Sequence, residues 1–419
     1  MPKPDHQGQT PQITSLSDGA RRRAFFSMMV ALPLGGAGID ILLPSLPAMA
    51  EHFKTSETAV QSSIVVYMAG YGISQFLMGP VTDHFGRRKP ILLGTVLFIL
   101  AAIAITLSDA IWMVLALRFI QGIGAASSAV GARSIVVDCY KGKERAKAAN
   151  WMTISWAAGP VLSPGLGGYL QDWFGWTSTF WFIAGWGVLV LLVVFFIMPE
   201  THPRTQSSKL LASFKPFGQM IRHRVYLFSA LAMGSLITVL YGFEVLAPFY
   251  VITDMQYTPI VYGHLQLVMG CLWLLGSLSN RLLSAYLLTF ATIIVCGVIA
   301  CSISIIMIFL DLSGAFSIWW LALPAGIIFF LASTIWPNLF SLCLSAFPDA
   351  GGVANAGVSS LFVVISAVFS FFGILLVSQT AWPMWCLLTF AVGICLFIVV
   401  FFLGDVFPDL RKRAKDQVT

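Results

Sequence analysis

The chain alternates long apolar runs with short polar segments along most of its length. Six apolar runs precede a polar stretch near residue 210, and six follow it. The runs cover residues 24–50, 58–80, 91–107, 112–136, 148–170, 177–198, 225–252, 259–279, 284–310, 316–345, 353–378 and 383–404. About 20 apolar residues cross a bilayer as a helix. The pattern therefore predicts twelve transmembrane helices, and its continuous runs disfavour a β-barrel, whose strands alternate.

The polar stretch divides the predicted helices into two equal groups. We expect an all-α integral membrane protein of two pseudo-symmetric six-helix bundles. The expected parts are an N-terminal tail (1–23), a first bundle (24–198), a linker (199–224), a second bundle (225–404) and a C-terminal tail (405–419). The first run is too long for a signal-peptide core and no typical cleavage site follows it, so we expect it to be retained.

Composition supports a membrane protein and argues against several other classes. Hydrophobic residues make up 58% of the chain and charged residues only 10%, with a mean hydropathy of +0.85, whereas soluble domains carry about 25% charged residues. The seven cysteines form no CxxC pair, and no histidine pair has ligand spacing. We therefore expect no metal, no cofactor and no enzymatic constellation, and no nucleic-acid partner despite the net charge of +6.

The distribution of basic residues predicts the orientation in the membrane. With the N-terminus inside, 21 of the 24 Lys and Arg residues fall on the inner side, and Lys54 is the one assigned to the outer side. The other two, Arg118 and Arg133, lie within the fourth apolar run. Positive residues favour the cytoplasmic side. We expect a multi-pass protein of the bacterial inner membrane, monomeric, in contact with lipid, with both termini in the cytoplasm.

A few ionisable residues interrupt the apolar runs and are candidates for proton coupling. Asp40 and Glu244 each lie four residues before a proline, Pro44 and Pro248, in the first and seventh runs. These runs correspond if the halves are related by internal symmetry. Charged groups inside a membrane are costly and often mark proton relays, and burial changes how tightly a carboxyl group holds its proton. We assign proton coupling to Asp40, Arg118 and Glu244. The alternatives are a purely structural Asp40–Arg118 pair and, for Glu244, a solvated position near the outer surface.

Three further motifs resemble those of a known transporter family. GPVTDHFGRRKP (79–90) is similar to the G-x-x-x-D-x-x-G-R-[RK] signature of the major facilitator superfamily, between its second and third helices. RFIQGIG, from Arg118, resembles a helix-4 motif of proton-coupled members, and GPVLSPGLGG, from Gly159, resembles the helix-5 motif of exporters. Together with GIDILLPSLP (38–47), the motifs resemble Bcr/CflA-type drug–proton antiporters. The segment SLSNRLLS in the second half lacks the acidic residue and basic cluster of the signature.

The resemblance implies a conformational latch and a hinge. Part of the latch is expected against the start of the eleventh helix, near Gly351 and Gly352. The residues implied are Gly79, Asp83, Gly86, Arg87, Arg133, Gly159, Pro160, Pro164, Gly167 and Gly168. Small residues allow close helix packing, and prolines bend helices.

Aromatic and hydrogen-bonding residues in the same helices are candidates for lining a substrate cavity. They are Tyr67, Gln75, Gln121, Trp156, Tyr241, Trp336 and Asn338. Ligand pockets use such residues, although each one alone is more often a packing residue.

The function expected from the sequence is proton-driven export of small amphipathic drugs or metabolites by alternating access. The nearest alternative is a dedicated exporter of one natural product, such as a siderophore or peptide antibiotic. A proton-coupled importer ranks third. A membrane-embedded enzyme or a non-transporting sensor is favoured by no motif in the sequence.

Overall fold

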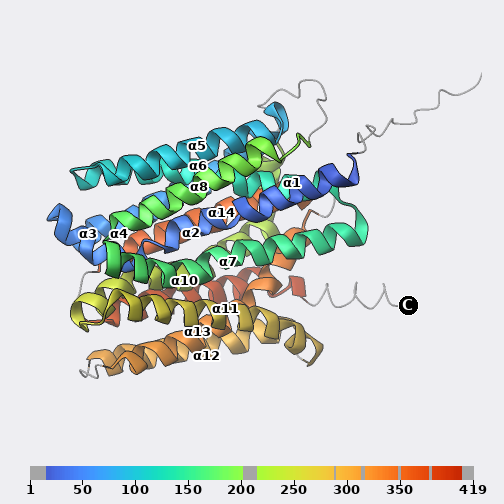
Figure 1. The fold of residues 1–419 in the computed structure, drawn as a ribbon. Helices are drawn as coiled ribbons and strands as arrows, with labels where there is room; N and C mark the ends of the chain where they lie inside the picture. The colour runs from blue at the N-terminus through green and yellow to red at the C-terminus, as the bar shows by residue number, and fades with distance from the viewer. Residues whose placement is uncertain are drawn as a thin grey trace, which may run out of the picture.

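The computed structural model of the protein describes residues 16–201, 215–286, 289–312, 317–347, 351–376 and 380–407. Within these residues the regular structure is helical throughout. The chain folds into two groups of long, roughly parallel helices, which Figure 1 shows in blue to green and in yellow to red.

The first membrane crossing is a broken helix. It consists of α1 (Asp18–Ala31), α2 (Pro33–Asp40), a 3₁₀ turn η1 (Leu43–Ser45) and α3 (Leu46–Phe53). The prolines at 33 and 44 explain the breaks, because proline has no backbone N–H to donate within a helix. The second bundle has a comparable interruption, since α10 (Arg224–Pro248) ends at a proline and continues as a π-helical segment, η3 (Phe249–Asp254).

The remaining helices are mostly continuous. In the first bundle they are α4 (Glu57–Phe85), α5 (Arg88–Thr106), α6 (Ile111–Cys139), α7 (Gly142–Phe174) and α8 (Thr177–Phe196). A short helix in the linker, α9 (Lys215–Arg222), precedes α10. The second bundle adds α11 (Pro259–Tyr286), α12 (Thr289–Leu312), α13 (Ile318–Ser345), α14 (Gly351–Ile374), and α15 (Trp382–Ile398) with its π-helical end η5 (Val399–Leu403).

Eleven crossings in the described part of the chain are long and apolar enough to span a membrane. The twelfth long helix is α7, which has 33 residues. Its apolar character is diluted by small and polar residues, such as Asn150, Ser155, Gly159 and Ser163, that follow the charged segment 143–147. The predicted all-α fold of two six-helix bundles is thus confirmed.

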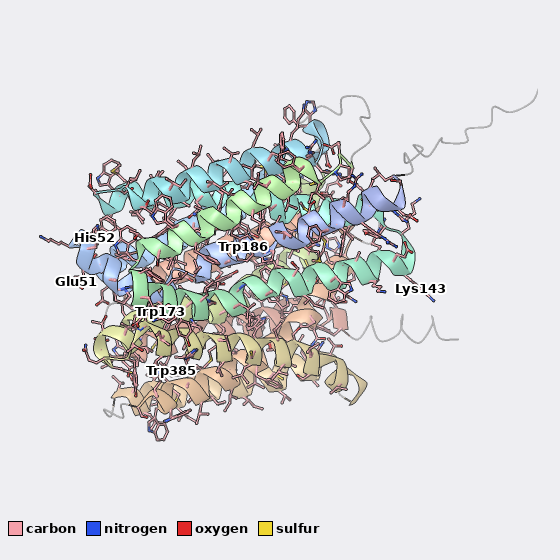
Figure 2. All side chains as sticks on the ribbon, viewed as in Figure 1. Glu51, His52, Lys143, Trp173, Trp186 and Trp385 are labelled. Atoms are coloured by element: carbon pink, nitrogen blue, oxygen red, sulfur yellow. The ribbon has the colours of Figure 1, made fainter. Side chains whose placement is uncertain are left out.

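The two ends of the molecule differ in what they carry. We call the end at which α1 begins and α8 ends the terminal face, and the other end the opposite face. Lys143 lies at the terminal face, whereas Glu51 and His52 lie at the opposite face (Figure 2). Between the ends, large apolar side chains such as Leu93, Leu278 and Phe309 are about 70% exposed, as a lipid-facing surface requires.

Two helix pairs form the largest contacts between the bundles. α4 packs against α14, and α7 packs against α11. On the α4 side, Ser360 Oγ donates to the Gly72 carbonyl at 2.6 Å, and nearer the opposite face Thr58 Oγ1 donates to the Ile374 carbonyl at 3.3 Å.

The α7–α11 contact is concentrated toward the opposite face. A Cβ on Gly168 would meet Pro259 backbone at 2.6 Å, and one on Gly263 would meet the Pro164 carbonyl at the same distance. Figure 1 shows the two helices separating toward the terminal face. The bundles are therefore joined more closely at the opposite face along this flank.

Candidate functional site

Asp40 lies where the first crossing is broken. It is the last residue of α2 and is 1% exposed. Pro44 follows four residues later and cannot donate to the Asp40 carbonyl, so the regular helical hydrogen bond at this point is missing. The break places a carboxyl group and an irregular backbone in the middle of the protein, an arrangement that membrane proteins tolerate inside a bundle.

Glu244 occupies the matching position in α10. It is 4% exposed, and Pro248 leaves its carbonyl without the usual helical donor. Tyr262 of α11 supplies a donor instead, with its hydroxyl 3.4 Å from that carbonyl. Gln266 in turn donates to the Tyr262 hydroxyl at 2.6 Å. The acid-and-proline pattern that recurs in the first and seventh apolar runs is therefore accompanied by a similar local disruption of both helices.

The structure brings the two acids together. The buried side chains of Asp40 and Glu244 lie close enough to interact electrostatically across the bundle interface. Around them, η1 of the first bundle lies against α10 and α11 of the second. Two predicted coupling residues, 204 positions apart in the sequence, thus form one buried group.

Arg118 is a neighbour of this pair and not its salt-bridge partner. Its guanidinium donates to the Gly38 carbonyl at 2.8 Å, to Gln121 Oε1 at 2.7 Å and to the Ser63 carbonyl at 3.4 Å. It also lies over the Tyr67 ring, 4.2 Å from the ring centre. Arg118 interacts with Asp40 through its charge, without a direct hydrogen bond. The arginine therefore braces the backbone of α2 just before the break.

Four buried tyrosines surround the acids. Tyr67 and Tyr71 come from α4, Tyr241 from α10 and Tyr262 from α11, and all four interact electrostatically with one another or with the acids. The Tyr67 hydroxyl donates to the Gly35 carbonyl at 2.8 Å. The surroundings of the pair are thus polar, and within the described part of the chain Arg118 is the cationic side chain that interacts with Asp40.

The other predicted cavity residues have partners within the protein. Gln121 is held by Arg118, and Trp156 interacts with the Tyr71 side chain. Asn338 donates to Asn280 at 2.9 Å, and Trp336 packs edge-on against Phe362 at 5.0 Å between ring centres. Their contact with a substrate stays a prediction.

Arg133 connects the two bundles nearer the terminal face. Its guanidinium donates to Ser359 of α14 at 2.5 Å and to Gln75 of α4. A further bond at 3.1 Å joins it to the Ala129 carbonyl. The predicted latch residue thus forms a bridge between neutral partners that must break if this end of the interface opens.

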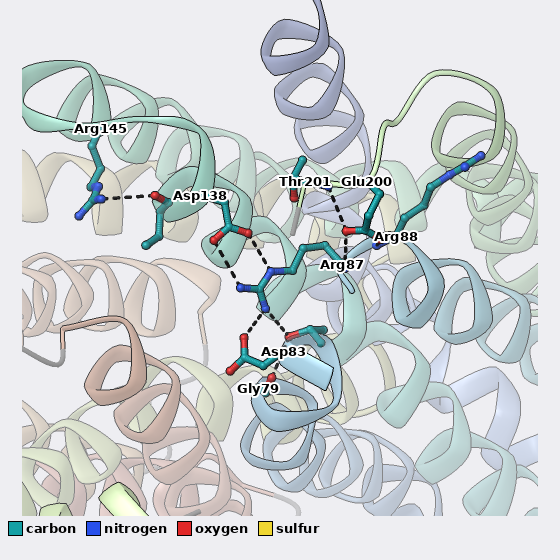
Figure 3. A network of polar contacts seen from close by, with 10 residues as sticks. Gly79, Asp83, Arg87, Arg88, Asp138, Arg145, Glu200 and Thr201 are labelled. Carbon is teal, nitrogen blue, oxygen red and sulfur yellow. Dashed lines mark hydrogen bonds and ion pairs between the residues drawn. The ribbon is translucent and has the colours of Figure 1, made fainter. Parts of the chain in front are cut away.

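The predicted latch around Arg87 lies within the first bundle (Figure 3). Arg87 donates to Asp138 at 2.9 Å and also pairs with Asp83, while its backbone N–H donates to Glu200 at 2.8 Å. Burial lowers the pKa of the Arg87 guanidinium, but Asp138 and Asp83 outweigh this and raise it overall. Gly86 ends α4 with a φ of 85°, a conformation that favours glycine. The side-chain surroundings of Gly351 and Gly352 lie outside the described residues.

The helix-5 motif residues place α7 between the acid-bearing helix and the second bundle. Gly159 faces the backbone at Pro33, Gly167 faces the backbone at Ile41, and Pro160 packs against Gly36. On the other flank, Pro164 and Gly168 face α11. A movement of α11 can therefore reach the Asp40 segment through α7.

Glycine substitutions should separate close-packed motif positions from open ones. A Cβ at Gly167 would collide with the Ile41 backbone, whereas one at Gly79 would meet nothing within 4 Å. We expect Gly167→Ala to lower stability by about 1–3 kcal/mol, the usual cost of overpacking. The check is thermal unfolding of the purified protein in detergent, with Gly79→Ala as the matched control. Equal melting temperatures for the two variants would contradict the assigned contact.

Several residues of this site were not predicted from the sequence. Tyr262 and Gln266 are spaced one helical turn apart, a signal that was present but weak. Asp138 and Glu200 complete the Arg87 network. Asp311 is also buried, 5% exposed, and accepts a bond from the Tyr250 hydroxyl at 3.4 Å.

Comparisons with known proteins agree with the fold. The sequence model of the Major Facilitator Superfamily matches residues 28–360. Multidrug resistance protein D of Escherichia coli K12 is 26% identical over 353 residues, 82% of this chain and 86% of that protein. YdgK of Bacillus subtilis, an uncharacterized MFS-type transporter, is 34% identical over 50% of this chain and 53% of its own length. Multidrug resistance protein MdtL of E. coli O139:H28 is 35% identical over 46% of this chain and 47% of that protein.

Solved structures resemble most of the chain at low identity. The D-xylose–proton symporter superposes with a TM-score of 0.69 at 14% identity, covering 90% of this chain and 97% of its own. The human organic anion transporter MFSD10 gives a TM-score of 0.62 at 18% identity, covering 90% and 98%. The family match spans more than half of the chain, and the fold agrees with it. The protein is therefore a member of the Major Facilitator Superfamily, a multi-pass membrane transporter.

Proposed function

We propose that the protein is a proton-coupled antiporter that exports small amphipathic drugs or metabolites across the bacterial inner membrane. The observation that carries this proposal is the buried acid Asp40, placed at a helix break and at the interface of the two bundles. Such a group is costly in a membrane and suits a proton relay. An interface position also exposes it to alternate sides as the bundles rock.

The relatives support drugs as the substrate class. Two of them carry the name multidrug resistance protein, and one of these aligns over 82% of this chain. Gly159, Pro160 and Gly167, which belong to the segment that resembles the exporter motif, pack on the crossing that carries Asp40. Transport in the outward direction, in exchange for protons, is consistent with both features.

The side of the membrane follows from the basic residues. Arg88, Lys143 and Arg224 lie at or near helix ends on the terminal face. Positive residues favour the cytoplasmic side, so the termini are assigned to the cytoplasm. The closer packing at the opposite face then corresponds to a conformation closed toward the outside.

An imposed pH gradient tests this function. We expect purified protein in liposomes to move a fluorescent cationic or neutral drug against its own gradient when only a pH difference is applied. A panel of unrelated drugs distinguishes a multidrug exporter, which moves several, from a dedicated exporter, which moves one. Drug movement unaffected by the pH difference would rule out proton coupling.

A further inference from the structure

We infer that Asp40 and Glu244 form a single proton-binding site shared between the bundles, in which one bound proton holds the opposite face closed. This inference rests on the proposed proton coupling and adds Glu244 as the second half of the site. The ligand is a proton, and the partners that bind it are carboxyl groups from α2 and α10.

The oxygen atoms of the pair make the case for a shared proton. Both carboxylate oxygens of Asp40 and Oε2 of Glu244 are buried, and no donor among the described residues reaches them. The two side chains nevertheless lie close to each other across the interface and interact electrostatically. An ionised carboxylate only accepts hydrogen bonds, so a bond between two of them requires a proton on one. Two ionised carboxylates at this depth would repel each other.

The groups packed around Asp40 and Glu244 direct their donors elsewhere, so a bound proton is what holds the two carboxyl groups together. From α6, Arg118 contributes a positive charge, but its donors are directed to Gly38, Gln121 and Ser63. Among the described residues, the other titratable groups that interact with the acids are the hydroxyls of Tyr67 from α4, Tyr241 from α10 and Tyr262 from α11, and Tyr71 lies beside Tyr67 and Tyr241. Tyr67 and Tyr262 donate to backbone carbonyls.

The position of the pair links the proton to the conformation. Its two helices belong to different bundles, and the contacts beside it, η1 with α10 and α3 with η3, lie toward the opposite face. Opening that face separates α2 from α10 and breaks the bond. Loss of the proton leaves two facing negative charges, which favour separation. Closure should therefore be favoured at low pH and lost as the pH rises.

Spin labels provide a test that requires no substrate. Leu107 and Leu312 lie at the opposite face on different bundles and are 73% and 64% exposed. Both are replaced by cysteine and labelled in a Cys271→Ser background, because Cys271 is the exposed native cysteine among the described residues. Double electron–electron resonance in lipid nanodiscs then measures the label distance between about pH 5 and pH 9, a range that covers the titration of buried carboxyl groups.

Amide substitutions give the decisive comparison. Asn or Gln donates N–H to the remaining carboxylate without a proton. We expect the wild-type pair to shift from short to long label distances with rising pH. Asp40→Asn and Glu244→Gln should each keep the short distance at every pH. Glu57→Gln, which removes another acid from this end of the interface, should keep the wild-type shift.

Three outcomes would overturn the shared site: a wild-type distance that does not depend on pH, a wild-type shift that persists in Glu244→Gln, or a Glu244→Gln variant that remains open at low pH. None of these measures transport. Loss of pH-driven export in Asp40→Asn, together with a wild-type distance shift in Glu244→Gln, would support the proposed antiport and contradict the shared site. Label distances that behave as expected, together with no drug movement under a pH gradient, would support the shared site and contradict the proposed antiport.

Discussion

Asp40→Asn is expected to abolish export driven by a pH gradient. For a one-for-one electroneutral exchange, a difference of two pH units supports a drug gradient of about 100-fold, since each tenfold ratio corresponds to about 1.4 kcal/mol. The amide cannot exchange protons, so the gradient should collapse to about unity. The measurement is drug accumulation in proteoliposomes with the membrane potential clamped to zero.

Asp311→Asn is the matched control for this experiment. Asp311 is also a buried acid near a membrane-spanning helix end, but its bond to Tyr250 lies within the second bundle. We expect this variant to keep a drug gradient close to that of the wild type. A full drug gradient in Asp40→Asn would show that Asp40 does not carry the coupled proton.

Arg118→Lys is expected to lose most transport although it keeps the positive charge. The arginine bridges Gly38 of α2, Ser63 of α4 and Gln121 of α6 with separate N–H groups. A lysine has a single ammonium group and lacks the planar fork of the guanidinium. We expect about a 10- to 100-fold fall in drug uptake per transporter, equivalent to about 1.4–2.7 kcal/mol.

A second readout separates positioning from charge pairing. If Arg118 acts by holding the α2 backbone, Arg118→Lys should also lower the melting temperature. Arg118→Met, which has a similar length and no charge, should resemble it in both assays. Near-complete rescue by lysine together with failure of methionine would instead favour an ion pair with Asp40.

The apolar pattern was sufficient to predict the bundles, because each membrane helix needs its own long apolar run. The acid–proline echo at Asp40 and Glu244 likewise pointed to equivalent helices. It did not indicate that the two side chains meet, because their contact depends on how the bundles are docked. The sequence also left two roles open for Asp40. It could form a structural pair with Arg118, or it could take part in proton coupling.

Residues that act through packing were harder to assign. Gly79 and Gly167 both belong to recognised motifs, yet only Gly167 faces another backbone closely in this conformation. Arg133 was predicted near the latch, but its bond to Ser359 crosses between bundles and required a three-dimensional arrangement. Tyr262 donates to the Glu244 carbonyl, which Pro248 leaves without a helical donor, and this contact is visible only in three dimensions.

The exchange of drug for protons can be measured by recording both fluxes in the same liposomes. A pH-sensitive dye inside the liposomes reports proton movement while drug fluorescence reports transport, with no applied pH difference at the start. An outward drug gradient should drive protons inward in wild-type liposomes and leave the internal pH unchanged with Asp40→Asn. Protons moving in the same direction as the drug, or drug movement without any change in internal pH, would contradict antiport.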